Sequence, residues 1–169
     1  MTLSTINVDS TPSQSNIFDI YGRSVPIISN AFRLTSIIKN YSEKQVFKEF
    51  NLSFSGFVVM WVIWVWGDLE TAKLAKNAGI AKSTLTGILK TLEKHGYCKR
   101  LPHSSDARRV VVHITNTGED LMEKIFPKFH EIEDMAASDL TSDEFETTID
   151  SLRTMLHTME QFTKKNNSK

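Results

Sequence analysis

Residues 71–118 hold most of the chemistry that this sequence offers, because basic side chains are concentrated there. Two acids, Glu93 and Asp106, stand against nine cations, for a net charge of +7. The nine are Lys73, Lys76, Lys82, Lys90, Lys94, Lys99, Arg100, Arg108 and Arg109. The whole chain has no net charge, so this stretch stands out as the kind of surface that meets phosphate groups.

Small and polar residues open the segment Lys82 to Lys94, which is typical of a helix that approaches DNA closely. The candidate DNA contacts in it are Lys82, Ser83, Thr84, Thr86, Gly87 and Lys90. Serine and threonine hydroxyls bond phosphates and base edges alike, so they position a protein more than they specify a sequence. Residues 82–94 contain no Asn, Gln or Arg. We therefore expect specificity to depend also on other contacts and on DNA shape.

Further candidate DNA contacts follow this segment, at Arg100, Ser104, Arg108 and Arg109. An arginine on a narrow ribbon is suited to the minor groove, whose potential attracts inserted cations. Asp106 would repel a phosphate, so we expect it to pair with an arginine and fix the loop. The sequence therefore predicts a basic, arginine-bearing tip beside the helix.

The local patterns indicate the elements that must position these residues. Thr71 to Ala78 reads as a short helix with Gly79 as its left-handed cap, and Lys82 to His95 as a second helix. Gly96 ends that helix. Strand-like runs follow at Tyr97 to Leu101 and at Val110 to Ile114, with turn residues from Pro102 between them. Helix, turn, helix and hairpin in this order predict a winged helix-turn-helix.

The rest of the chain reads as helices, so we predict a mainly α fold with a small β-wing. Breaks are expected at Asn51 and Ser53, and Pro127 should bend a helix that follows Gly118. Thr141 to Glu144 has the spacing of a capping box. The predicted parts are a flexible tail at 1–16, a dimerisation helix at 17–50, a DNA-binding domain at 51–118 and dimerisation helices at 119–165.

The amino-acid composition indicates which class of protein to expect. The 169 residues are 40% hydrophobic and 24% charged, as in ordinary globular proteins. The longest apolar run, Phe57 to Trp66, is about half of the roughly 20 residues that a bilayer needs. The start of the chain lacks the features of a signal peptide, and the single cysteine suits a reducing compartment. We therefore expect a cytoplasmic protein that does not span a membrane.

The run from Leu74 to Leu121 resembles the MarR family of transcription regulators. The matching positions are Leu74, Ala75, Thr86, Leu92, Glu93, Gly96, Arg100, Asp106, Arg108, Thr115 and Gly118. The resemblance implies a homodimer joined through its terminal helices, which represses at a pseudo-palindrome in double-stranded DNA and releases it when a small ligand binds. It also implies that Arg108 enters the minor groove and that Asp106 anchors the wing. Gly87 stands where many members carry a long side chain, which weakens any inference about the operator.

An aromatic cluster permits two interpretations. Phe57, Trp61, Trp64 and Trp66 crowd one segment, together with Met60, and they pack a core or line a pocket. The resemblance places ligands between the dimerisation helices and the winged part, where an aromatic lining suits a flat apolar effector. The candidate ligand-binding residues are Phe32, Phe57, Trp61 and Trp64.

Other chemistries have weaker support. Cys98 is either a buried residue or a redox sensor. Three histidines lie near it (His95, His103 and His113), but their spacing matches no zinc pattern. No motif of an enzyme is present, and no metal or cofactor is expected. The rival to a DNA-binding regulator is a protein-interaction module that keeps the winged scaffold.

Overall fold

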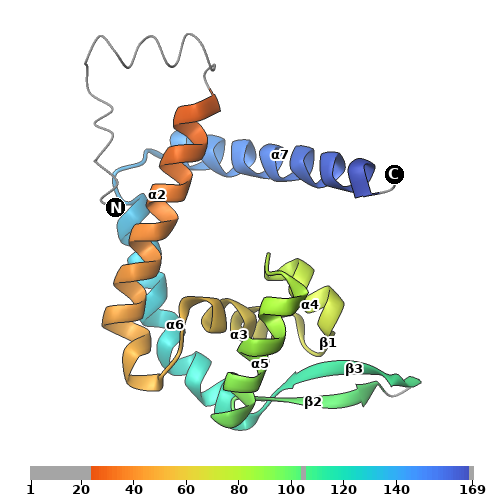
Figure 1. Ribbon diagram of the computed structural model, residues 1–169. Helices are drawn as coiled ribbons and strands as arrows, with labels where there is room; N and C mark the ends of the chain where they lie inside the picture. The colour runs from red at the N-terminus through yellow and green to blue at the C-terminus, as the bar shows by residue number, and fades with distance from the viewer. Residues whose placement is uncertain (1–23, 104–105, 168–169) are drawn as a thin grey trace, which may run out of the picture. The chain divides into compact units, whose positions relative to one another are not determined.

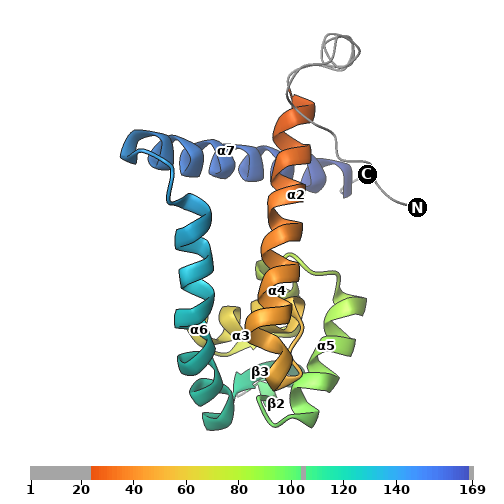
Figure 2. The same cartoon turned by 90° about the vertical axis from the view of Figure 1, so that its left-hand side faces the viewer.

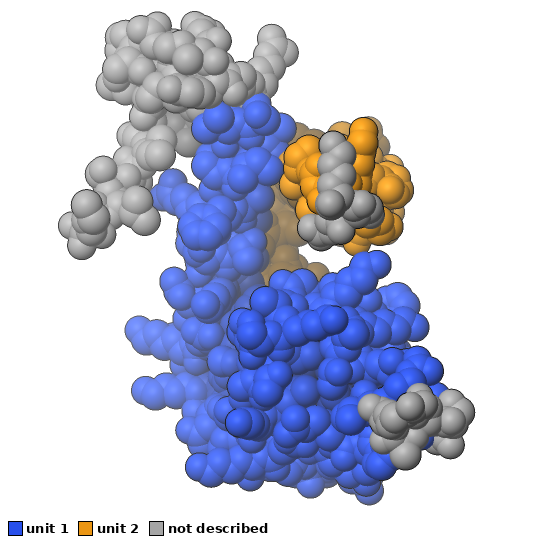
Figure 3. All heavy atoms as spheres, turned by 45° about the vertical axis from the view of Figure 1, so that its right-hand side comes forward, with its two compact units in different colours: residues 1–125 blue, residues 126–169 orange. Residues whose placement is uncertain are grey.

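The computed structural model describes residues 24–103 and 106–167. The chain divides into two compact units, residues 1–125 and residues 126–169, which are coloured separately in Figure 3. In chain order the elements are α2 (Ser24–Ser42), η1 (Glu43–Phe47), η2 (Lys48–Phe50), α3 (Phe54–Trp66), β1 (Leu69–Glu70), α4 (Thr71–Asn77), α5 (Lys82–Lys94), β2 (Cys98–His103), β3 (Asp106–Ile114), α6 (Asn116–Ala137) and α7 (Ser142–Asn167). The expected mainly helical fold with a small β-wing is confirmed.

The break before α3 lies where the sequence predicts it. Asn51 adopts a left-handed backbone with φ 50°, which Asn tolerates better than most residues. Ser53 then caps α3, since its hydroxyl accepts a hydrogen bond from the backbone N–H of Gly56 at 3.1 Å. Local side-chain chemistry therefore decides where α3 begins.

The three strands form one antiparallel sheet in the order β1-β3-β2. Figure 1 shows the β2–β3 hairpin extending away from α3, α4 and α5. The sheet differs from the sequence prediction in two places. Strand β1, in which Leu69 pairs with Val112, was missed. The turn expected from Pro102 onward is shorter, because Pro102 still pairs with Val110 in the ladder. Proline is tolerated there because β2 is an edge strand.

One apolar core holds the winged part together. Its fully buried side chains come from η1, α3, α4, α5, β3 and the first part of α6: Phe47, Val59, Met60, Val62, Ile63, Leu74, Leu85, Leu89, Leu92, Val112, Met122 and Ile125. Gly118 lies in a close approach, since a Cβ there would stand 2.1 Å from the carbonyl oxygen of Tyr97. The helix-turn-helix and the base of the hairpin thus share one packed interior.

Two long helices keep their apolar side chains exposed. In Figures 1 and 2, α2 projects beyond the other helices of its unit. Its exposed apolar residues are Val25, Ile27, Ile28, Phe32, Leu34, Ile37 and Tyr41. On α7 the exposed apolar residues are Phe145, Leu152, Leu156, Met159 and Phe162. Two separate helices therefore present apolar surface that the described residues of a single chain leave open.

The second unit begins within α6, which runs unbroken through Pro127. The capping box at the start of α7 is confirmed, because Glu144 Oε2 accepts from the Thr141 N–H at 2.9 Å and Thr141 Oγ1 accepts from the Glu144 N–H at 3.4 Å. The Thr141 hydroxyl also donates to Glu144 Oε2 at 2.8 Å, and the two bonds that the carboxylate accepts from Thr141 lower the pKa of Glu144.

Among the described helices, none is by itself long and apolar enough to cross a membrane. Residues 24–50 and Phe54–Trp66 pass the same test of length and composition only when they are taken together, and they meet at an angle of 75°.

Candidate nucleic-acid interface

Helix α5 turns its apolar side inward and its polar side outward. Leu85, Leu89 and Leu92 are buried, at the i, i+4 and i+7 spacing of one helix face. This anchoring leaves the six predicted contacts of the helix exposed: Lys82, Ser83, Thr84, Thr86, Gly87 and Lys90. The structure therefore places all six on α5 with access to solvent.

The turn before α5 fixes how the helix is presented. Gly79 has φ 64°, a conformation that costs glycine little. The N–H of Gly79 donates to the carbonyl of Lys76 at 3.1 Å, and the N–H of Ile80 donates to that of Ala75 at 2.9 Å. These bonds close α4 with the left-handed cap that the sequence predicts, so α5 starts from a defined turn.

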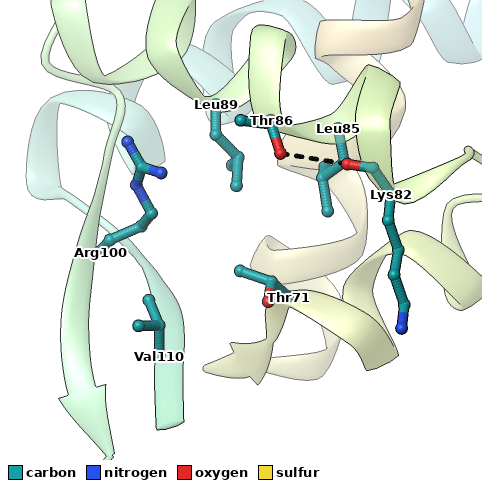
Figure 4. Close-up of a pocket in the computed structure, with 7 residues that line it drawn as sticks. All are labelled: Thr71, Lys82, Leu85, Thr86, Leu89, Arg100 and Val110. Atoms are coloured by element: carbon teal, nitrogen blue, oxygen red, sulfur yellow. Dashed lines mark hydrogen bonds between the residues drawn. The ribbon is translucent and has the colours of Figure 1, made fainter. Parts of the chain in front are cut away.

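Thr86, like Thr91, uses its hydroxyl in a hydrogen bond within α5. Its Oγ1 donates to the Lys82 carbonyl at 3.1 Å (Figure 4). With its proton used within the helix, this hydroxyl is set to accept rather than donate. An acceptor suits the exocyclic amino group of adenine or cytosine in the major groove, and it does not suit a phosphate.

Glu93 on α5 holds Arg100 on β2 by three hydrogen bonds. The Arg100 backbone N–H and Nε donate to Glu93 Oε1 at 3.2 and 2.9 Å, and Nη2 donates to Oε2 at 2.6 Å. Hydrogen bonding to this guanidinium lowers the pKa of Glu93 and raises the pKa of Arg100. In the structure this guanidinium joins α5 to β2, and the expected contact of Arg100 with DNA stays a prediction.

Two further polar contacts join β3 to the segment that holds Asp68 and Glu70. Arg109 Nε donates to Glu70 Oε2 at 3.1 Å, and Arg109 Nη2 donates to Glu70 Oε1. Asp68 Oδ1 lies 2.7 Å from His113 Nδ1. Sequence reasoning missed both carboxylates. The available signal was the alternation of two acids around the apolar Leu69, which is the pattern of a strand with one solvated face.

A hollow of about 270 Å³ lies between α5 and the wing (Figure 4). Its lining residues are Thr71, Lys82, Leu85, Thr86, Leu89, Arg100 and Val110. Leu85 and Leu89 of α5 and Val110 of β3 supply its apolar surface, and Lys82 and Arg100 supply positive charge. A second hollow of about 430 Å³ lies where α5 meets the start of α3, and Thr84 and Gly87 are among its lining residues. The recognition helix is thus flanked by a recess on each side.

Three of the predicted residues at the tip of the hairpin have side chains outside the described part of the structure. Ser104 lies outside the described residues. Asp106 and Arg108 lie on β3, but their side chains lie outside the part of the structure that is described. The minor-groove role of Arg108 and the anchoring role of Asp106 stay predictions.

The aromatic residues of α3 divide between core and surface. Phe57 is buried and stacks on Phe47 with ring centroids 4.7 Å apart. Trp61 is 38% exposed and Trp66 is 65% exposed. Phe57 therefore packs in the core, as do Met60, Val62 and Ile63 on the same helix, whereas Trp61 and Trp66 do not. Phe32 is exposed on α2, and the role of Phe32, Phe57, Trp61 and Trp64 in a ligand pocket stays a prediction.

Cys98 has the properties of a structural residue. It is buried on β2, and desolvation raises the pKa of its thiol to about 12. The thiolate is the reactive form, so burial makes this cysteine a poor redox sensor. Among residues 24–103 and 106–167, no three His, Cys, Asp or Glu side chains form a cluster that could hold a metal ion.

Comparison with known proteins identifies the family. The model of the MarR family matches residues 52–110. The chain is 35% identical over 120 residues to the uncharacterized HTH-type transcriptional regulator YwaE of Bacillus subtilis, which covers 71% of this chain and 70% of that protein. The chain belongs to the MarR family.

Solved structures agree on the fold of this MarR-family chain. A mutant MarR from E. coli, complexed with operator DNA, has a TM-score of 0.70 at 21% identity and covers 78% of this chain and 94% of its own. BpsR of Bordetella bronchiseptica, whose DNA binding is regulated by 6-hydroxynicotinic acid, has a TM-score of 0.69 at 20% identity and covers 77% and 98%. At these identities the likeness concerns the winged-helix fold alone.

Proposed function

We propose that this MarR-family regulator binds double-stranded DNA in a sequence-specific manner, with α5 in the major groove. The observation that carries the proposal is the outer face of α5, where six polar, small or basic residues are exposed over a buried leucine row. The basic hairpin beside α5 adds contacts to the phosphate backbone. The mutant MarR from E. coli, whose structure is complexed with operator DNA, supports the proposal that this chain binds DNA.

A salt titration tests this proposal against the rival, a protein-interaction module. Each phosphate contact contributes about −0.9 to the slope of log K against log salt. Lys90→Ala should reduce that slope by about 1 if Lys90 contacts a phosphate. Lys165→Ala, which removes an exposed lysine at the end of α7, serves as the matched control and should leave the slope unchanged. A flat salt dependence in the unmodified chain would favour the rival.

The wing is proposed to place Arg108 in the minor groove, with Asp106 as its anchor. Ser104 and Arg109 are proposed to lie near the phosphate backbone of the DNA. Arg108→Ala should cost about 1–3 kcal/mol of binding free energy if it reads base edges. An unchanged affinity for DNA would contradict the assignment of Arg108.

The protein is proposed to act as a homodimer. The apolar faces that α2 and α7 leave exposed are the surfaces that a second copy would cover. Two recognition helices about 34–36 Å apart would then meet one turn of a pseudo-palindromic operator. Sedimentation equilibrium at micromolar concentration should give twice the mass of the 19.2 kDa chain, and a monomer that binds DNA one to one would contradict this arrangement.

Repression and release by a small aromatic effector are proposed as the mode of regulation. The support is the regulation of BpsR by 6-hydroxynicotinic acid and the partly exposed tryptophan Trp61 beside Trp64 on α3. A panel of aromatic acids should quench tryptophan fluorescence and weaken DNA binding over the same concentration range. Absence of both effects with every acid would count against an effector of this class. The protein is not proposed to be an enzyme, and it is proposed to act in the cytoplasm.

A further inference from the structure

Glu70 occupies the N-cap position of α4, where short polar side chains are usual. It is the residue before α4, with the extended backbone of an N-cap (φ −61°, ψ 144°). Ser, Thr, Asp and Asn favour this position because their short side chains accept a hydrogen bond from the first turn. Glu70 makes no such bond. Its carboxylate reaches across to β3 instead and binds the guanidinium of Arg109.

The Glu70–Arg109 pair lies on the solvent-facing side of the sheet. Leu69 and Val112, which pair across β1 and β3, are buried. Side chains alternate along a strand, so Glu70 and Arg109 lie on the opposite face from these two residues. The side chain of Arg109 is 49% exposed and that of Glu70 is 34% exposed. Exposed ion pairs contribute little to stability and are readily opened by salt or by another anion.

Carboxylate and phosphate compete for the same donor geometry. A guanidinium presents two parallel N–H groups that fit either anion in a bidentate manner. Arg109 uses Nε and Nη2 in this way toward Glu70. Arg109 also stands on β3 of the basic hairpin, directly after Arg108. Glu70 therefore occupies the Nε–Nη2 edge of Arg109 and neutralises its charge, so a phosphate that approaches the hairpin competes with Glu70 for this guanidinium.

We propose that Glu70 limits the affinity of this protein for DNA, because its carboxylate occupies Arg109 and competes with a DNA phosphate for that guanidinium. This inference rests on the proposed DNA binding. It makes Glu70 an affinity-setting residue that acts through Arg109 without touching DNA itself. It also explains why Glu70 binds Arg109 instead of capping α4, although an exposed ion pair adds little stability.

The test is a salt series of binding to a labelled random-sequence duplex, because phosphate contacts do not depend on sequence. Glu70→Gln should make the slope of log K against log salt steeper by about 0.9, one phosphate contact, and strengthen binding about eightfold at 0.1 M salt. Glu70→Ser should give the same gain and also supply a capping hydroxyl to α4. Since only the serine variant adds a cap, a gain that both variants share cannot come from stabilisation of α4.

One background and one control variant separate competition for Arg109 from a general loss of negative charge. In a chain that carries Arg109→Ala, the further change Glu70→Gln should give no gain. Asp68→Asn removes the neighbouring carboxylate, which faces His113 and not an arginine, and it should leave the slope unchanged.

An equal gain in the Arg109→Ala background, or a loss of affinity in Glu70→Gln, would overturn the role of Glu70. A failure of the unmodified chain to bind any duplex would contradict the proposed function instead. The two failures are therefore distinguishable in one experiment.

Discussion

Removal of the charge of Glu93 is the perturbation whose magnitude can be worked out most fully from the structure. Glu93→Gln keeps the shape of the side chain but removes the anion that accepts three hydrogen bonds from Arg100. Fully exposed pairs contribute about 0–1 kcal/mol, and hydrogen bonds to charged groups about 1.5–3 kcal/mol. The two side chains are 36% and 26% exposed, so we expect a loss of about 1 kcal/mol.

Urea denaturation at a fixed protomer concentration measures this loss. With an m-value of about 2 kcal/mol/M, a change of about 1 kcal/mol lowers the unfolding midpoint by about 0.5 M. Protomer concentration must be held constant because the stability of a dimer depends on it. Glu146→Gln, an exposed glutamate on α7, is the matched control and should leave the midpoint unchanged.

The pH dependence supplies an independent check of the same pair. Arg100 lowers the pKa of Glu93 in the folded protein. A carboxyl group with a depressed folded pKa stabilises the protein fully above its unfolded pKa, about 4.3 for glutamate, and this stabilisation is lost as the pH falls through the folded pKa. The difference between the unmodified chain and Glu93→Gln should therefore be constant near neutral pH and disappear in acid. Equal midpoints at neutral pH, or a difference that persists in acid, would refute the role assigned to the pair.

Further predictions concern packing and reactivity. Gly118→Ala should destabilise the fold by about 1–3 kcal/mol or more in urea denaturation, because its Cβ would meet the Tyr97 carbonyl oxygen, whereas Gly87→Ala meets no atom within 4 Å and should stabilise α5 by about 0.5–1 kcal/mol. Leu89→Ala should cost about 2–5 kcal/mol, since this side chain is fully buried on α5; a loss below 1 kcal/mol would mean that the core of α5 is misassigned. Cys98 should react with a thiol-alkylating reagent far more slowly in the folded chain than in urea, because burial raises its pKa to about 12; equal rates would contradict its burial.

The sequence predicted those elements whose limits depend on nearby residues. The cap at Ser53, the left-handed turn at Gly79 and the capping box at Thr141 all rest on hydrogen bonds that span a few residues. Each was predicted at its observed place. The helix α5 was predicted to within one residue because its buried leucines recur at helical spacing.

Features that depend on distant partners were predicted less well. Strand β1 has two residues and depends on its pairing with β3, so the local alternation around Leu69 is too short to predict it. The exposure of Trp61 and Trp66 was missed because an apolar run does not say which of its sides a neighbour covers. The carboxylates of Glu70 and Glu93 were missed as partners of Arg109 and Arg100, since these pairs form only when the sheet and α5 are assembled.

A mobility shift on the DNA that flanks the protein's own gene, with excess nonspecific competitor, tests the central claim most directly. The account predicts a discrete shift that survives the competitor and weakens as salt is raised. Failure to shift that DNA, followed by failure to enrich any sequence from a pool of random duplexes, would contradict sequence-specific binding and favour the interaction-module interpretation.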